Sequence, residues 1–337
     1  MSAYIKAISY YLPENKLTNE DINSQFPEWS ITKIAEKTGI SQRPISAIDE
    51  FSSDMAVKAA QKLFEENNIS PSDIDFILLC TQSPDYYLPT TACLIQDRLG
   101  IPTTAGALDF NLGCSGYVYG LGLAKGLVET EQANNVLLLT SETYSKFIYP
   151  QDKSVRTIFG DAAAATLISG DNDRKNSIKA LVYGTDGSGA QNLVVKTGGM
   201  RYARTTETAT AKYDELGNLR TEDALYMNGA EIFVFTLASV PKLITAVLQK
   251  AGTTIDDIDL VVFHQANTYM LEALRKKIAI PKEKFFVFLE NCGNTVSSTI
   301  PIALSEAIKT GRAPKGSKVL IAGFGVGYSW GGAIIEL

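Results

Sequence analysis

Three short polar segments carry the residue types that could do chemistry. His264, the one histidine in the chain, follows the apolar run Val-Val-Phe, whereas Cys114 and Asn294 each lie beside glycine, in Leu-Gly-Cys-Ser-Gly and Cys-Gly-Asn-Thr. A thiol can act as a nucleophile, an imidazole can exchange a proton near neutral pH, and an amide is a fixed donor. The three segments together predict a Cys/His/Asn site.

Cys114 is the candidate nucleophile. It opens a predicted helix, where free N–H groups and the positive end of the helix dipole lower the pKa of a thiol and favour the thiolate. The alternative is a small buried core cysteine, and Cys114 alone does not decide between the two. Of the other cysteines, Cys80 and Cys93 are expected to fill the core, and Cys292 is given no role.

His264 and Asn294 also have structural alternatives. A lone histidine at a strand end is often a hydrogen-bonded core residue, and asparagine is a common helix N-cap. Three polar residues at equivalent breaks are harder to attribute to packing and capping, so we favour a shared site. The four cysteines have no CxxC spacing, and a single histidine does little to complete a zinc site, so no metal is expected.

An internal repeat indicates how the three segments are positioned. Residues 57–80 and 241–264 share one plan, in which an amphipathic helix, a polar turn containing Asp-Ile-Asp and a continuous apolar strand follow one another. Alternating helices and strands favour largely parallel sheets covered on both faces. The repeat predicts a layered, pseudo-twofold α/β protein with an N-terminal half at 1–175 and a C-terminal half at 176–337. The polar residues 198–225 are expected to form a surface excursion.

Composition narrows the classes of function. A chain of 337 residues, 45% hydrophobic and 20% charged, is globular and long enough for two cores. A net charge of −6 argues against nucleic acid as a partner, because phosphate binding needs a basic face. The chain has no run of about 18 apolar residues and its first residues do not resemble a signal peptide, so no membrane association and a cytoplasmic location are expected.

At this point the motifs resemble a known family, the β-ketoacyl-acyl carrier protein synthase III enzymes of the thiolase fold. The similarity runs nearly from end to end. It is carried by Cys-Ser-Gly at 114, His-Gln-Ala-Asn at 264, Gly-Asn-Thr at 293, Gly-Phe-Gly-Val-Gly-Tyr-Ser-Trp-Gly at 323, Tyr-Leu-Pro-Glu-Asn at 11, Lys-Thr-Gly-Ile at 37, Ile-Phe-Gly-Asp at 158 and Tyr-Met-Asn-Gly at 226.

The resemblance implies an α-β-α-β-α arrangement of layers and a decarboxylating Claisen condensation in fatty acid or related acyl-chain biosynthesis. Cys114 would accept an acyl primer, with its own backbone N–H and that of Val326 forming the oxyanion site. His264 and Asn294 would then bind the enolate formed from malonyl-acyl carrier protein. The family also implies a homodimer in which Leu88 reaches the partner's acyl pocket, and substrates that are acyl thioesters without a separate cofactor.

Departures from the family pattern concern the acyl donor. Lys33 stands where well-studied members carry a tryptophan that stacks on the adenine of coenzyme A, and Lys153 stands where an arginine often contacts its phosphates. Tyr269 replaces an arginine commonly assigned to carrier docking, whereas Lys276 and Lys277 remain for that role. The sequence leaves open primer length and branching, the choice between coenzyme A and carrier-bound donors, and primary or specialised metabolism.

Two other functions stay open at this stage. The first is a non-decarboxylating acyltransferase of a specialised pathway, which would use the same three residues to pass the acyl group to an amine or alcohol. The second is a silent subunit that only binds acyl carrier protein. Retention of Cys114 argues against the silent subunit, because such subunits commonly lose the nucleophile.

Overall fold

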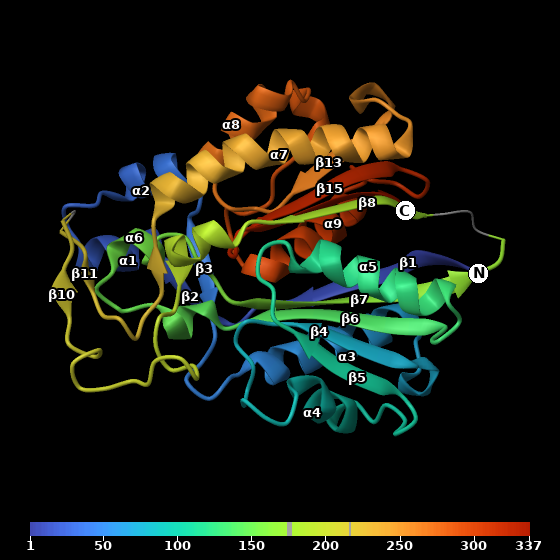
Figure 1. Cartoon of the computed structure of the whole chain (residues 1–337), viewed down its shortest axis with the longest axis horizontal. Helices are drawn as coiled ribbons and strands as arrows, with labels where there is room; N and C mark the ends of the chain where they lie inside the picture. The colour runs from blue at the N-terminus through green and yellow to red at the C-terminus, as the bar shows by residue number, and fades with distance from the viewer. Residues whose placement is uncertain (174–176, 216) are drawn as a thin grey trace.

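Two five-stranded sheets form the framework of the chain (Figure 1). The computed structural model describes residues 1–173, 177–215 and 217–337. The first sheet has the order β1-β7-β6-β4-β5 and the second the order β8-β16-β15-β13-β14. The strands are β1 Ser2–Tyr11, β4 Phe76–Cys80, β5 Gly106–Phe110, β6 Asn135–Glu142, β7 Ala162–Asp171, β8 Ile178–Thr185, β13 Leu260–Phe263, β14 Phe285–Phe286, β15 Lys318–Gly325 and β16 Ser329–Glu336.

The two sheets have the same topology. Along each order, the first two pairings are antiparallel and the last two are parallel. The expectation of largely parallel sheets is therefore wrong for half of each sheet. The reason is that β7 and β16 run antiparallel to the strands before them in the chain. Parallel neighbours need a crossover connection such as a helix, whereas β15 and β16 are joined by a short turn.

Helices separate and cover the sheets, giving the predicted α-β-α-β-α layers (Figure 1). Helices α5 and α9 lie between the sheets, α3 and α4 cover the first sheet, and α7 and α8 cover the second. Their bounds are α3 Ser52–Asn67, α4 Thr91–Arg98, α5 Gly116–Glu129, α7 Gly229–Ala251, α8 Thr268–Ile278 and α9 Thr299–Lys309.

Smaller elements gather at one end of the sheets, to the left in Figure 1. Within residues 198–225 the structure has only the two-stranded ladder β10–β11 among the described residues, and most side chains are exposed, as expected for a surface excursion. The smaller elements at this end of the sheets are α1 Asn19–Gln25, α2 Ile31–Thr38, α6 Lys153–Arg156, β2 Asn15–Thr18, β3 Gln42–Ile45, β9 Leu193–Val194, β10 Lys212–Tyr213, β11 Leu219–Arg220 and β12 Tyr226–Met227.

Helix α7 is long and apolar enough to cross a membrane, judged by length and composition. Among the described residues it is the one helix of that kind. Its buried side chains include Phe235, Leu243 and Val247, and it packs on β8, β15 and β16 of the second sheet. Core helices of globular proteins share these properties, so α7 is weak evidence for a membrane span.

The end of β15 packs directly on the turn that precedes α5. A Cβ atom at Gly323 would lie 2.6 Å from the Cys114 carbonyl oxygen and 2.8 Å from Cα of Ser115. Both neighbours are backbone atoms, which cannot rotate away as a side chain could. Glycine at 323 is therefore required for the two halves of the fold to meet at this point.

We expect Gly323→Ala to lower the free energy of unfolding by about 1–3 kcal/mol, because the added methyl overpacks this contact. Gly126→Ala is the matched control, since a Cβ there meets no atom of the described residues within 4 Å outside its own helical turns, and alanine favours the α5 helix. The control should be neutral or slightly stabilising. Urea unfolding of both variants measures the difference, and equal stabilities would contradict the packing argument.

Candidate active site

Cys114 lies in the turn between β5 and α5, two residues before the helix begins. Its side chain is buried, and a Cβ atom at Gly325 would lie 2.9 Å from its Sγ. The backbone N–H groups of Val326 and of Cys114 itself are directed at the sulfur and act to lower the thiol pKa. Cys114 is therefore close to the end of β15 and faces the two N–H groups assigned to the oxyanion site.

His264 follows the last residue of β13 and is also held by β15. Its backbone N–H donates to the Ala322 carbonyl at 2.7 Å, and its ring meets the Phe324 ring edge to face at 5.7 Å between centroids. Ala322 and Phe324 alternate along β15 with the two glycines that contact the Cys114 turn. One strand end thus brings the thiol of the first half and the imidazole of the second half to the same place.

Asn294 is fixed by backbone contacts across the halves. Its N–H donates to the Ile158 carbonyl at 3.0 Å, and its carbonyl accepts from the Gly160 N–H at 3.0 Å. Gly293 has a φ of +64°, and a Cβ there would lie 2.9 Å from the Ile158 carbonyl oxygen, so this turn requires glycine. Helix α9 begins five residues after Asn294 and has Ser298 at its N-cap position, so Asn294 is not the N-cap of that helix.

The Asn294 amide faces the imidazole. Its Oδ1 accepts from the Val296 N–H at 2.9 Å, which leaves Nδ2 as the donor directed at His264 Nε2, 3.5 Å away. On the other side of the ring, Nδ1 lies 2.7 Å from the Thr299 hydroxyl. That hydroxyl can donate to the Val296 carbonyl, at 3.0 Å, or to Nδ1. Rotation of this one hydroxyl therefore allows either neutral tautomer of His264.

Burial controls the protonation of both groups. It lowers the pKa of His264 to about 3, so the imidazole is neutral at physiological pH. It raises the pKa of Cys114 to about 12, and the nearby Glu142 acts in the same direction. The expected lowering of the thiol pKa is wrong, because desolvation outweighs the N–H groups of Val326 and Cys114. The thiol must therefore lose its proton during attack on the substrate.

Glu142 is a buried acid that sequence reasoning missed. It lies at the end of β6 and accepts hydrogen bonds from the Gln82 backbone N–H (3.1 Å), the Ser83 hydroxyl (3.2 Å) and the Ser297 hydroxyl (3.0 Å). Desolvation raises its pKa to about 8 despite these bonds. A glutamate that ends a strand with an apolar centre, Val136 to Leu139, is the sequence signal that could have indicated it.

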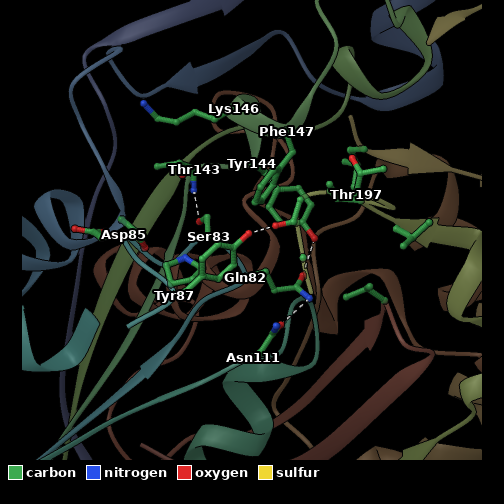
Figure 2. Close-up of a pocket in the computed structure, with 18 of the residues that line it drawn as sticks. Gln82, Ser83, Asp85, Tyr87, Asn111, Thr143, Tyr144, Lys146, Phe147 and Thr197 are labelled. Carbon is green, nitrogen blue, oxygen red and sulfur yellow. Dashed lines mark hydrogen bonds between the residues drawn. The ribbon is translucent and has the colours of Figure 1, made fainter. Parts of the chain in front are cut away.

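A cavity of about 580 Å³ lies beside the nucleophile turn (Figure 2). Gln82 and Val326 line it, and both contact Gly113, the residue before Cys114. Leu88, assigned to the partner's pocket, does not line this cavity in its own chain, and 82% of its surface is exposed. Much of the remaining lining is apolar and comes from Phe147, Leu193, Val194, Val195 and Leu225.

The two cysteines that are expected to fill the core, Cys80 and Cys93, differ in their exposure to solvent. Cys80 is buried, as expected, and its thiol donates to the Leu112 carbonyl at 3.0 Å. Cys93 is exposed on α4, so the expectation that it fills the core is wrong. The reason is that α4 buries its other face, through Ala92 and Ile95.

The positions assigned to donor binding lie on helices α2, α6 and α8, outside the segments that carry the three site residues. Lys33 is exposed on α2, and Lys153 forms an ion pair with Glu28 at 2.8 Å, which partly neutralises its charge. Lys276 and Lys277 are exposed near the end of α8, about 12 Å along the helix from its first residue.

Comparison with known proteins gives the family. Models of 3-oxoacyl-(acyl-carrier-protein) synthase III match residues 108–187, and models of the C-terminal part of that enzyme match residues 248–337. The chain is 36% identical over 339 residues to β-ketoacyl-(acyl-carrier-protein) synthase III of Caldanaerobacter subterraneus subsp. tengcongensis, covering 100% of this chain and 98% of the relative. The chain belongs to the β-ketoacyl-acyl carrier protein synthase III family.

Solved structures agree with this assignment. One titled 3-oxoacyl-(acyl-carrier-protein) synthase III is 51% identical, with a TM-score of 0.99 and 100% coverage of both chains. The synthase from Burkholderia xenovorans LB400 is 34% identical, with a TM-score of 0.91, covering 100% of this chain and 94% of that one. As a member of the synthase III family, the chain has the thiolase fold and is an acyl-transferring condensing enzyme.

We expect Glu142→Gln to change how stability depends on pH. The folded-state pKa of about 8 lies above the ordinary 4.5, so the stabilising contribution of Glu142 is complete below about pH 4.5 and is lost as pH rises through 8. Glutamine has no charge to bury. The free energy of unfolding of the variant, relative to the unmodified protein, should therefore rise by more than about 1 kcal/mol between about pH 5 and about pH 9.

Glu272→Gln is the control for this prediction. Glu272 is half-buried on α8, and hydrogen bonding to Arg275 lowers its pKa to about 2, so its charge does not change over the pH range of the experiment. Its effect on stability should be constant over that range. A constant difference for Glu142→Gln as well, measured by urea unfolding, would show that Glu142 does not titrate as described.

Proposed function

We propose that this enzyme loads an acyl primer on Cys114 and condenses it with malonyl-acyl carrier protein, releasing carbon dioxide. One observation carries the proposal. A buried thiol that faces two backbone N–H groups lies at the same strand end as a neutral imidazole paired with a side-chain amide. The thiol can accept an acyl group while the two N–H groups stabilise the oxyanion that forms. The imidazole and the amide can donate hydrogen bonds to an enolate oxygen.

In the loading step, the Cys114 sulfur attacks the primer thioester. The bond between sulfur and the acyl carbon forms, the donor's carbon–sulfur bond breaks, and the Cys114 proton ends on the departing thiol. The N–H groups of Cys114 and Val326 would stabilise the oxyanion. The apolar cavity beside Gly113 would hold the acyl chain.

In the second step, malonyl thioester loses carbon dioxide and its electron pair remains as an enolate. The Asn294 amide would donate to the enolate oxygen, joined by His264 Nε2–H when the Thr299 hydroxyl donates to Nδ1. A donor of this kind is worth about 3 kcal/mol in other oxyanion sites. The enolate carbon then attacks the acyl group, a carbon–carbon bond forms, and the Cys114 sulfur leaves as a thiolate that takes a proton from solvent.

The donor is proposed to be carried by acyl carrier protein in preference to coenzyme A. Lys33 offers no stacking platform for adenine, a contact worth about 1–3 kcal/mol elsewhere. The pairing of Lys153 with Glu28 weakens a second contact. Lys276 and Lys277 are proposed to dock the acidic carrier. Their exposure on α8 supports that role, and of the two Lys276 is also paired with Glu272 at 3.5 Å.

The enzyme is further proposed to act as a cytoplasmic homodimer. Tyr86, Tyr87 and Leu88 are consecutive large side chains that expose 61%, 81% and 82% of their surface. Tyr86 and Tyr87 also line the acyl cavity, so a partner seated on this loop would complete that cavity. Leu88 would then reach the cavity of the partner, as the family resemblance implies.

Acylation of Cys114 is the first test of the function. We expect intact mass to show one acyl group per chain after incubation with acyl-carrier protein, acyl-coenzyme A or acyl-N-acetylcysteamine, with the highest specificity constant for the carrier. Cys114→Ala should take up none, because the buried thiols Cys80 and Cys292 donate to backbone carbonyls instead, and the exposed Cys93 on α4 does not line the acyl cavity. Acylation of the alanine variant would show that the nucleophile is assigned wrongly.

The two half-reactions are expected to separate in His264→Ala and Asn294→Ala. Both variants should still acylate Cys114 but lose carbon dioxide release from malonyl thioester by at least about a hundredfold, since each removes a donor to the enolate. Release of labelled carbon dioxide and intact mass measure the two steps. If both variants lose acylation to the same extent as decarboxylation, the division of roles is wrong.

A further inference from the structure

A chain of three polar side chains lies in the wall of the acyl cavity. The Tyr144 hydroxyl donates to Gln82 Oε1 at 2.6 Å, and Gln82 Nε2 donates to Asn111 Oδ1 at 3.2 Å (Figure 2). All three residues line the cavity. We call Gln82, Asn111 and Tyr144 the polar wall.

The polar wall lies at the thioester end of the cavity. A Cβ atom at Gly113 would be 2.5 Å from Gln82 Oε1, and Gly113 is the residue before Cys114. The rest of the lining includes the apolar side chains of Phe147, Leu193 and Leu225. A primer held on Cys114 would therefore pass the polar wall first and the apolar lining afterwards.

The polar wall has donors to spare. Gln82 Nε2 and Asn111 Nδ2 each carry two hydrogens. Of these four hydrogens, one on Gln82 Nε2 reaches an acceptor within the described part of the chain, which is Asn111 Oδ1. Gln82 is half-buried and Asn111 is exposed, so these donors are open to solvent in the cavity. A plain alkyl primer would cover them without offering an acceptor. Leaving a polar group covered and unpaired is expected to lower affinity by roughly 5- to 150-fold.

We propose that the polar wall selects primers that carry an oxygen substituent near the thioester, such as 3-hydroxyacyl or 3-oxoacyl groups, over unsubstituted alkyl primers. The inference rests on the proposed function, because it concerns the group loaded on Cys114. The substituent accepts hydrogen bonds from Gln82 and Asn111 and is unchanged by loading. Loading itself exchanges one carbon–sulfur bond for another, with the Cys114 proton leaving on the donor's thiol.

The test compares the rates at which 3-hydroxyoctanoyl- and octanoyl-N-acetylcysteamine acylate Cys114, read by intact mass. The unmodified enzyme should prefer the hydroxylated primer at least about tenfold. Gln82→Met keeps the length of the side chain without its amide and should reduce the preference below about threefold. Gln61→Met, at an exposed position on α3, is the matched control and should leave the preference unchanged.

The outcomes separate this inference from the proposed function. Acylation by both primers at equal rates, or a preference that Gln82→Met retains, overturns the role of the polar wall alone. No acylation by any thioester overturns the proposed function and this inference with it. If Gln82→Met does not fold, Asn111→Leu, which removes the other amide donor of the polar wall, is measured in its place and should also reduce the preference.

Discussion

The contact between the end of β15 and the turn before α5 is the constraint on which the site depends. Gly323 and Gly325 let the strand meet the backbone and sulfur of Cys114, while neighbouring residues of β15 hold His264. The two sheets share one topology, so the same kind of strand end occurs in each half, and the site forms where the halves meet. A side chain at 323 would separate them.

Burial at this junction also sets the chemistry. The same loss of water raises the pKa of Cys114 and Glu142 and lowers that of His264, so all three groups favour their neutral forms. A site without stable charges must bind developing negative charge with hydrogen bonds. That requirement is met by the N–H groups at Cys114 and by the amide of Asn294, which keeps its donor at any pH.

The layers and the convergence of Cys114, His264 and Asn294 could be predicted from the sequence because both follow from local patterns. The repeat of helix, turn and strand indicated the two halves, and polar residues that follow an apolar run or lie beside glycine indicated Cys114, His264 and Asn294. Glu142, the exposure of Cys93 and the raised thiol pKa depend on which side chains meet in space. Local patterns do not report such contacts, and for Glu142 they give only the glutamate at the end of β6. The antiparallel strands were missed for another reason: alternation of strands and helices does not reveal a short return such as the β15–β16 turn.

The stoichiometry of a single turnover tests the central claim most directly. Enzyme preloaded with one acyl group on Cys114 is mixed with malonyl-acyl carrier protein labelled in its free carboxyl group. A decarboxylating condensation predicts one labelled carbon dioxide and one 3-oxoacyl product for each acyl group lost from Cys114. Loss of the acyl group without carbon dioxide, with transfer to an amine or alcohol, would contradict the account.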